Sequence, residues 1–218
     1  MLIFSAFAFE ASAQDAPYKY DIGASLGMSG YLGNANRSSI FKHPGFNGNI
    51  VAAYLPNVRW AFRAVLGVTT LSGNTADMQN YLPEEWQNYS FKSTVFSLDV
   101  RAEFNFLPFG IGETYKRLSR WSPYLTLGVG GCMSRCDGAT GFAPTLPMGG
   151  GVKFKANQRL NLFAEFVMTK AFGSKIDNIV DPYGIKMAFY KNTDWFSRIN
   201  IGLTFEFGER CQTCHYQD

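Results

Sequence analysis

The residues of this chain that could carry chemistry are its four cysteines and two histidines. Cys211 and Cys214 precede His215 in a Cys-x-x-Cys-His segment, the pattern at which haem is covalently attached. Haem also needs an apolar pocket and usually a second axial ligand, and this segment predicts neither. We therefore expect no cofactor. A local disulfide between Cys211 and Cys214 and a covalent link to a partner protein both remain open.

The other candidates are weaker. Cys132 and Cys136 stand close together at the start of a predicted loop, so we expect a disulfide within that loop if the chain is exported. His43 lies beside Pro44 in another predicted loop and is the one candidate general base. No serine or acid stands at a fixed spacing from it. We expect His43 to lie on the surface and predict no metal site and no catalytic residue.

The composition indicates one folded domain. Of 218 residues, 17% are charged, 16% are aromatic and 22 are glycine. Disordered chains lack aromatic residues, and soluble helical domains carry more charge. The net charge is only +3, and no run of lysine and arginine occurs, which argues against a nucleic-acid partner.

The first residues are typical of an export signal. Residues 2–9 form a short apolar run, and an Ala-Ser-Ala cleavage site follows at 11–13. We expect residues 1–13 to be a signal peptide, 14–208 the folded domain and 209–218 a C-terminal tail. No basic residue precedes the apolar run, so the true start of the signal stays open. Export predicts an oxidising compartment.

Strict alternation of apolar and polar residues predicts β-strands, and residues 94–106 show it best. There, Phe96 and Leu98 share one face, whereas Ser97 and Asp99 share the other. No apolar stretch approaches the ~20 residues of a transmembrane helix, but several alternating segments approach the ~9–11 residues of a transmembrane strand. The pattern predicts an all-β fold, an eight-stranded antiparallel up-and-down transmembrane barrel, with strands at 19–28, 46–55, 60–68, 94–106, 124–133, 143–155, 159–172 and 195–207.

The predicted connections alternate in length. Tight or modest turns are expected at 56–57, 108–122 and 156–158, and long loops at 33–45, 72–90, 134–142 and 173–194. Short periplasmic turns opposite long extracellular loops are typical of outer-membrane barrels, whereas a soluble sandwich has no reason to separate the two. The connections therefore favour the outer membrane.

Aromatic residues cluster near the short turns. Amphipathic rings favour the boundary between lipid and water, so we expect a girdle there. The alternative is a set of aromatic plugs at the end of a soluble sheet. The residues concerned are Tyr54, Trp60, Phe106, Phe109, Trp121, Tyr124, Phe154 and Phe207.

The face opposite the apolar one carries eight charged residues, four of each sign. They are Arg63, Asp99, Arg101, Glu103, Lys153, Glu165, Arg198 and Glu206. Closure of an eight-stranded barrel hides this face from lipid and leaves an interior just wide enough for side chains. We therefore expect these charges to interlock as a polar plug, rather than to line an open channel or act as acid–base pairs.

Five segments of the sequence resemble the PorG family of Bacteroidota. They are RWAFRAVLGVTTLSG (59–73), RAEFNFLPFG (101–110), SPYLTLGVGG (122–131), PMGGGVKFKANQRLNLFAEF (147–166) and DWFSRINIGLTFEFG (194–208). Members of that family are outer-membrane barrels of the type IX secretion system. The resemblance implies a membrane anchor for the periplasmic ring of the secretion machine, which is neither the translocation channel nor an enzyme.

We therefore expect a non-enzymatic barrel, integral to the cell outer membrane, that contacts outer-membrane lipid and docks periplasmic ring proteins of the secretion system. Its candidate contact residues are Lys116, Arg117 and Arg120 on the long periplasmic turn and Cys211 and Cys214 on the tail. For the basic turn, a solvated face or contact with anionic headgroups stays equally open. Two further classes are an adhesion or ligand-display barrel that binds through loops 72–90 and 173–194, and a lipid-modifying outer-membrane enzyme.

Overall fold

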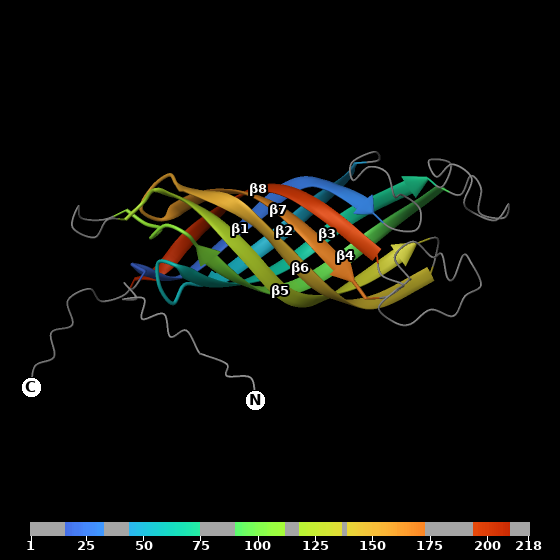
Figure 1. The fold of residues 1–218 in the computed structure, drawn as a ribbon, viewed down its shortest axis with the longest axis horizontal. Helices are drawn as coiled ribbons and strands as arrows, with labels where there is room; N and C mark the ends of the chain where they lie inside the picture. The colour runs from blue at the N-terminus through green and yellow to red at the C-terminus, as the bar shows by residue number, and fades with distance from the viewer. Residues whose placement is uncertain are drawn as a thin grey trace, which may run out of the picture.

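The computed structural model describes residues 16–32, 44–74, 90–111, 118–136, 139–172 and 194–209. Eight antiparallel strands close into one barrel, in which each strand pairs with its neighbours in sequence and β1 pairs with β8 (Figure 1). The strands are β1 Tyr18–Leu32, β2 Gly45–Tyr54, β3 Trp60–Asn74, β4 Ser90–Asn105, β5 Trp121–Cys136, β6 Ala139–Lys155, β7 Leu160–Ala171 and β8 Asp194–Glu209. The predicted fold class is confirmed. The described residues contain no helix of the length and apolarity needed to cross a membrane.

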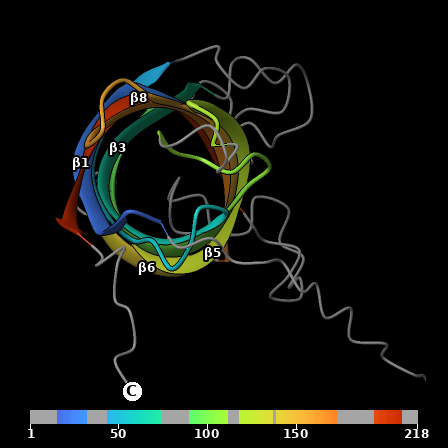
Figure 2. The same cartoon turned by 90° about the vertical axis from the view of Figure 1, so that its left-hand side faces the viewer.

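The two ends of the barrel differ in their connections. At one end, here called the short-turn end, residues 55–59, 106–120 and 156–159 join successive strands. At the opposite end the connections are 33–44, 75–89, 137–138 and 172–193. Figure 2 shows the closed ring from the short-turn end. The predicted signal peptide, His43 and all of the predicted tail after Glu209 lie outside the described residues.

Each strand presents an apolar face outward and a mostly polar face inward. On β8, Ile199, Ile201 and Leu203 are exposed on the outside of the barrel, whereas Asn200 and Thr204 are buried inside. The predicted inside and outside faces of this strand are confirmed. A few apolar residues also pack together in the interior, among them the cluster of Val51, Val65 and Phe163. The arrangement reverses that of a soluble protein, because apolar residues cover the surface and charges lie within.

Several strands continue past their predicted ends at the end opposite the short turns. The prediction of a loop at 134–142 is wrong, because β5 runs to Cys136 and pairs there with Ala139 at the start of β6. Outward positions there include Arg135 and Thr140, so the apolar alternation is interrupted. Backbone pairing does not depend on that alternation, and the hydrogen-bonded ladder therefore extends beyond it.

Glycines on the inner face make room where backbones and large side chains approach closely. A Cβ added to Gly128 of β5 would lie 2.7 Å from the Cα and 2.8 Å from the Cγ of Arg101. By contrast, a Cβ at the outward Gly48 of β2 would meet nothing closer than 3.5 Å. The interior therefore requires glycine at position 128, whereas the outer surface does not require it at position 48.

We expect Gly128→Val to destabilise the barrel by about 1–3 kcal/mol, because the added side chain overfills a packed interior. Gly48→Val is the matched control and should leave stability unchanged or slightly raise it. Urea unfolding of the two refolded variants, followed by tryptophan fluorescence, measures the difference. Equal midpoints for the two variants would contradict this account of the interior glycines.

Candidate functional site in the barrel interior and at its short-turn end

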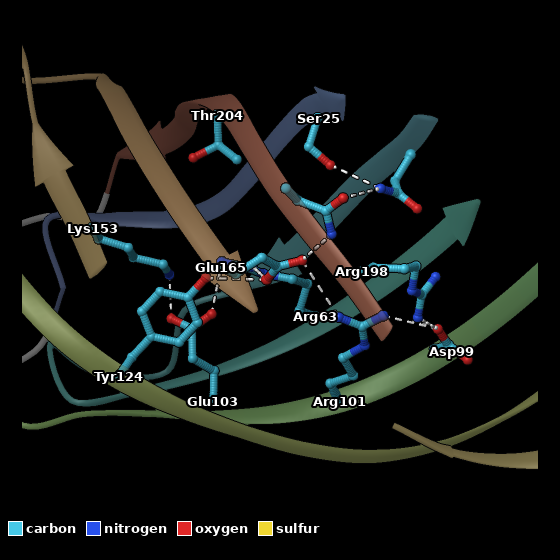
Figure 3. Close-up of polar contacts among 12 residues, drawn as sticks. Ser25, Arg63, Asp99, Arg101, Glu103, Tyr124, Lys153, Glu165, Arg198 and Thr204 are labelled. Atoms are coloured by element: carbon cyan, nitrogen blue, oxygen red, sulfur yellow. Dashed lines mark hydrogen bonds and ion pairs between the residues drawn. The ribbon is translucent and has the colours of Figure 1, made fainter. Parts of the chain in front are cut away.

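The interior of the described barrel holds ten buried charged side chains, five basic and five acidic. They are Asp21, Arg63, Asp99, Arg101, Glu103, Lys153, Lys155, Glu165, Arg198 and Glu206. All eight charged residues expected inside are among them, and Figure 3 shows most of the set. Alternation along each strand turns these residues away from the apolar outer face. Their charges sum to zero.

Seven of these groups form one continuous line of alternating charge. Lys153 pairs with Glu103, which also lies 2.7 Å from Nη2 of Arg63. Nη1 of Arg63 then reaches Oε2 of Glu165 across the lumen, at 3.3 Å (Figure 3). β3, β4, β6 and β7 supply these four side chains, so the line ties together strands on different sides of the barrel.

The line continues toward the middle of the barrel. Arg101 lies 3.6 Å from Glu165 and 2.9 Å from Asp99, and Asp99 lies 3.1 Å from Arg198. A buried charge is costly unless it is paired and hydrogen-bonded. The paired side chains fill an interior that is just wide enough for side chains in an eight-stranded barrel. The arrangement can hold the wall together and block passage through the lumen.

Uncharged side chains satisfy further oxygens of the network. The Tyr124 hydroxyl donates to Glu165 at 3.1 Å, and the Asn200 amide donates to the same carboxylate at 3.0 Å. Tyr124 was expected in the outer girdle, and that prediction is wrong, because it is buried inside the barrel. The alternation in the sequence could have placed this residue. Trp121, Pro123 and Leu125 face outward, whereas Tyr124 shares the inward face with Ser122 and Thr126.

A second polar group lies near the short-turn end, and two of its members were missed by sequence reasoning. Lys155 pairs with Glu206 at 2.6 Å, and Asn161 donates to the same carboxylate at 2.8 Å. Asp21 accepts a hydrogen bond from Thr204 at 3.3 Å. Asp21 and Lys155 both occupy inward positions of their strands, two residues from Gly23 and Lys153. The alternation pattern could have identified both.

The described parts of the turn between β4 and β5, residues 106–111 and 118–120, lie over part of the mouth at the short-turn end (Figure 2). Its Phe109 donates a backbone hydrogen bond to the Val58 carbonyl at 3.2 Å and is buried. The ring lies 5.9 Å from Nζ of Lys153 and 5.3 Å from Nζ of Lys155, in cation–π contacts. The expectation of Phe109 in the girdle is therefore also wrong. A cavity of about 20 Å³ beneath this turn has room for one water molecule.

The six other residues of the predicted girdle lie outward near the short-turn end. They are Tyr54, Trp60, Phe106, Trp121, Phe154 and Phe207, all exposed. Tyr20 joins them, with its ring centroid 5.7 Å from those of Tyr54 and Phe207. An exposed belt of rings at one level of a barrel is typical of a membrane boundary.

The candidate docking residues are only partly described. Arg120 is exposed just before β5, and its carbonyl accepts a hydrogen bond from the Lys155 backbone at 2.6 Å. Lys116, Arg117, Cys211 and Cys214 lie outside the described residues. Their part in docking therefore stays a prediction.

The expected disulfide between Cys132 and Cys136 does not fit the backbone. Both residues belong to the continuous strand β5 rather than to a loop. Four residues of extended strand separate two Cα atoms by about 13 Å, whereas a disulfide requires less than about 7 Å. The Cys132 side chain is buried in the interior. Among the described residues, no group of three or more His, Cys, Asp or Glu side chains is placed to hold a metal ion.

Small outer-membrane barrels of known structure share this fold. Neisserial surface protein A is 14% identical with a TM-score of 0.54, over 86% of this chain and 97% of that one. Ail, the attachment invasion locus protein of Yersinia pestis, solved in complex with sucrose octasulfate, is 11% identical with a TM-score of 0.51, over 88% and 100%. A major outer membrane protein from Thermus thermophilus is 12% identical with a TM-score of 0.50, over 86% and 99%. At these identities the likeness shows the fold alone.

The comparison by sequence gives a family. No curated protein matches the chain. The model of DUF6089, a domain of unknown function, matches residues 1–216, almost the whole sequence. The chain therefore belongs to the DUF6089 family and has the fold of the small outer-membrane β-barrels.

Proposed function

We propose that this protein is a non-enzymatic outer-membrane β-barrel that docks a periplasmic partner complex at its short-turn end. One observation carries the membrane part of the proposal: large apolar side chains are exposed on every strand, while ten charges are buried within. Monomeric soluble proteins rarely expose continuous apolar surface of this extent. A lipid environment accounts for it, and closure of the barrel pairs the backbone groups that lipid would leave unsatisfied.

Because the interior is filled, the ends of the barrel are the surfaces available for binding. The line from Lys153 to Arg198 occupies the lumen, so transport through it is not the function that the geometry supports best. Short turns of outer-membrane barrels face the periplasm. In this orientation Arg120, Lys116 and Arg117 would meet a periplasmic partner, and a tail that follows β8 would leave the barrel on the same side.

The identity of the partner rests on sequence resemblance. The five segments that resemble the PorG family extend from Arg59 to Gly208 and include six of the eight strands at least in part. We propose that the partner is the periplasmic ring of the type IX secretion machinery. The barrel would serve as its anchor in the outer membrane.

The tail cysteines give a direct test of docking. A disulfide that spans two intervening residues closes almost no loop and adds little stability, and closely spaced cysteines of this kind exchange readily. We expect Cys211→Ser with Cys214→Ser to leave barrel assembly intact and to lower recovery of the partner complex. Non-reducing gels of whole envelope should show a higher band that reductant and the double variant both abolish.

The basic turn is tested separately by Lys116→Gln with Arg117→Gln, which should also lower partner recovery. Cys132→Ser is the matched control, because this cysteine is buried in the barrel interior. A monomer band alone, with unchanged partner recovery in both docking variants, would contradict the docking proposal. Loss of ligand binding on replacing residues 75–89 and 173–193 would then support surface display instead.

A further inference from the structure

The barrel can be divided into four hairpins, β1–β2, β3–β4, β5–β6 and β7–β8. At the short-turn end, the first strand of each hairpin carries or directly follows one basic residue, and the four residues lie at about the same level. Lys19 is the second residue of β1, and Arg59, Arg120 and Arg159 stand just before β3, β5 and β7. The backbone carbonyl of each accepts a hydrogen bond at 2.6–2.8 Å from near the end of the neighbouring strand or from the residue just after it. The donors are Leu55, Asn105, Lys155 and Glu206. The four residues, here called the basic collar, therefore repeat around the rim at about 10 Å, two strand spacings.

The basic collar is accessible and carries a net positive charge. Lys19, Arg120 and Arg159 are exposed and Arg59 is half-buried. The one exposed acid among the described residues of this rim is Glu209, which already pairs with Arg159. The Tyr18 hydroxyl and the Glu209 carboxylate raise the pKa of Arg159 above its ordinary value. The ten buried charges of the interior sum to zero and therefore do not offset the positive charge of the collar.

The collar directly adjoins the exposed aromatic belt. Tyr20, Trp60 and Trp121 are the outward residues that follow Lys19, Arg59 and Arg120 in sequence. Nη1 of Arg59 donates to the Phe106 carbonyl at 3.4 Å, which holds this guanidinium beside the belt. Aromatic rings favour the headgroup level of a bilayer, and basic side chains just beyond that level meet the phosphates.

We propose that the basic collar binds the phosphates of anionic phospholipids in the membrane leaflet at the short-turn end. The inference rests on the proposed function only in that the barrel must span a bilayer. A docked protein would contact one side of the rim, whereas a headgroup layer surrounds the barrel and meets all four hairpins. The even distribution of the collar over β1, β3, β5 and β7 favours the lipid layer. Binding would orient the barrel and enrich anionic lipid around it.

Trp60 and Trp121 make the test specific, because each follows a collar arginine. A variant with Trp86→Phe and Trp195→Phe leaves only these two tryptophans as reporters. The refolded barrel is placed in phosphatidylcholine vesicles that contain phosphatidylglycerol, with brominated acyl chains on one lipid or the other. Bromine quenches tryptophan on contact. We expect brominated phosphatidylglycerol to quench more strongly per molecule, by a factor on the order of five, the factor expected for one basic residue near an anionic surface.

The ratio of quenching by the two brominated lipids should fall to one when salt screens the charges. It should also fall to one in a variant with Lys19, Arg59, Arg120 and Arg159 all changed to glutamine. The double variant Arg59→Gln with Arg120→Gln should lose most of the preference, and Arg135→Gln with Lys170→Gln, at the opposite end, should keep it. Equal quenching by the two lipids in the barrel with an unmodified collar overturns the proposal. It does so even if the glutamine variants lose binding to an acidic protein partner, because the collar would then bind protein and not lipid. Absence of quenching by either lipid would instead mean that the barrel does not enter the bilayer, so the proposed function would fail.

Discussion

Replacing Glu165 by leucine is expected to lower the free energy of unfolding of the barrel by about 3–5 kcal/mol, because the change removes one partner from a buried ion-pair network. Glu165 lies 3.3 Å from Arg63 and 3.6 Å from Arg101, and it accepts hydrogen bonds from Tyr124 and Asn200. Leucine fills a similar volume, so the loss would reflect charge rather than a cavity. Urea unfolding in detergent micelles, followed by tryptophan fluorescence, measures it.

Glu209→Gln is the matched control, since Glu209 is also in an ion pair, but with Arg159 at the exposed rim. Water already solvates both of these charges, so the control should unfold at the urea concentration of the unmodified protein. A double variant, Glu165→Leu with Arg63→Met, should recover part of the lost stability, because it also removes a cation left without one of its partners. Similar midpoints for Glu165→Leu and Glu209→Gln would show that the interior network contributes nothing to stability.

The second large effect concerns the outer surface. Leu98→Arg should strongly reduce assembly of the barrel in bilayers, because an arginine facing lipid costs about 2–4 kcal/mol near the midplane. Leu98 is 57% exposed on β4 and pairs with Leu66 of β3 and Gly131 of β5. Leu203→Arg on β8 should act in the same way. The fraction of folded barrel on unboiled gels, where a closed barrel migrates differently from the unfolded chain, measures both effects.

Ser97→Arg is the informative comparison, because Ser97 is buried inside the barrel, next to Leu98 in sequence and 3.3 Å from Nη1 of Arg198. An arginine there overfills the interior and adds a like charge, so it should impair folding equally in bilayers and in detergent micelles. The penalty of Leu98→Arg should shrink in micelles, where water reaches the surface. Assembly of Leu98→Arg at the level of the conservative Leu98→Met in bilayers would be incompatible with a lipid-facing β4.

Much of the fold followed from alternation alone. A period of two along residues 94–106 and 195–207 determined which side chains face out, because successive residues of a strand point to opposite faces. The ends of strands could not be predicted in the same way. β5 and β6 continue to Cys136 and from Ala139, where hydrogen bonds between backbones persist after the apolar pattern has stopped. Residue type alone could not place Phe109 and Tyr124, because a large ring suits both a membrane boundary and the interior near the mouth of a barrel.

The sequence by itself determined the number of strands, their two faces and eight of the ten charges buried in the interior, since each of these depends on neighbours along the chain. Only the tertiary structure decided which charges meet. Arg63 and Glu165 are 102 residues apart, on strands that do not pair, yet their side chains meet at 3.3 Å across the lumen. That contact depends on barrel closure and on the register of all the strands between β3 and β7. The equal spacing of Lys19, Arg59, Arg120 and Arg159 around the rim has the same origin, because closure brings the starts of four separate strands to one level.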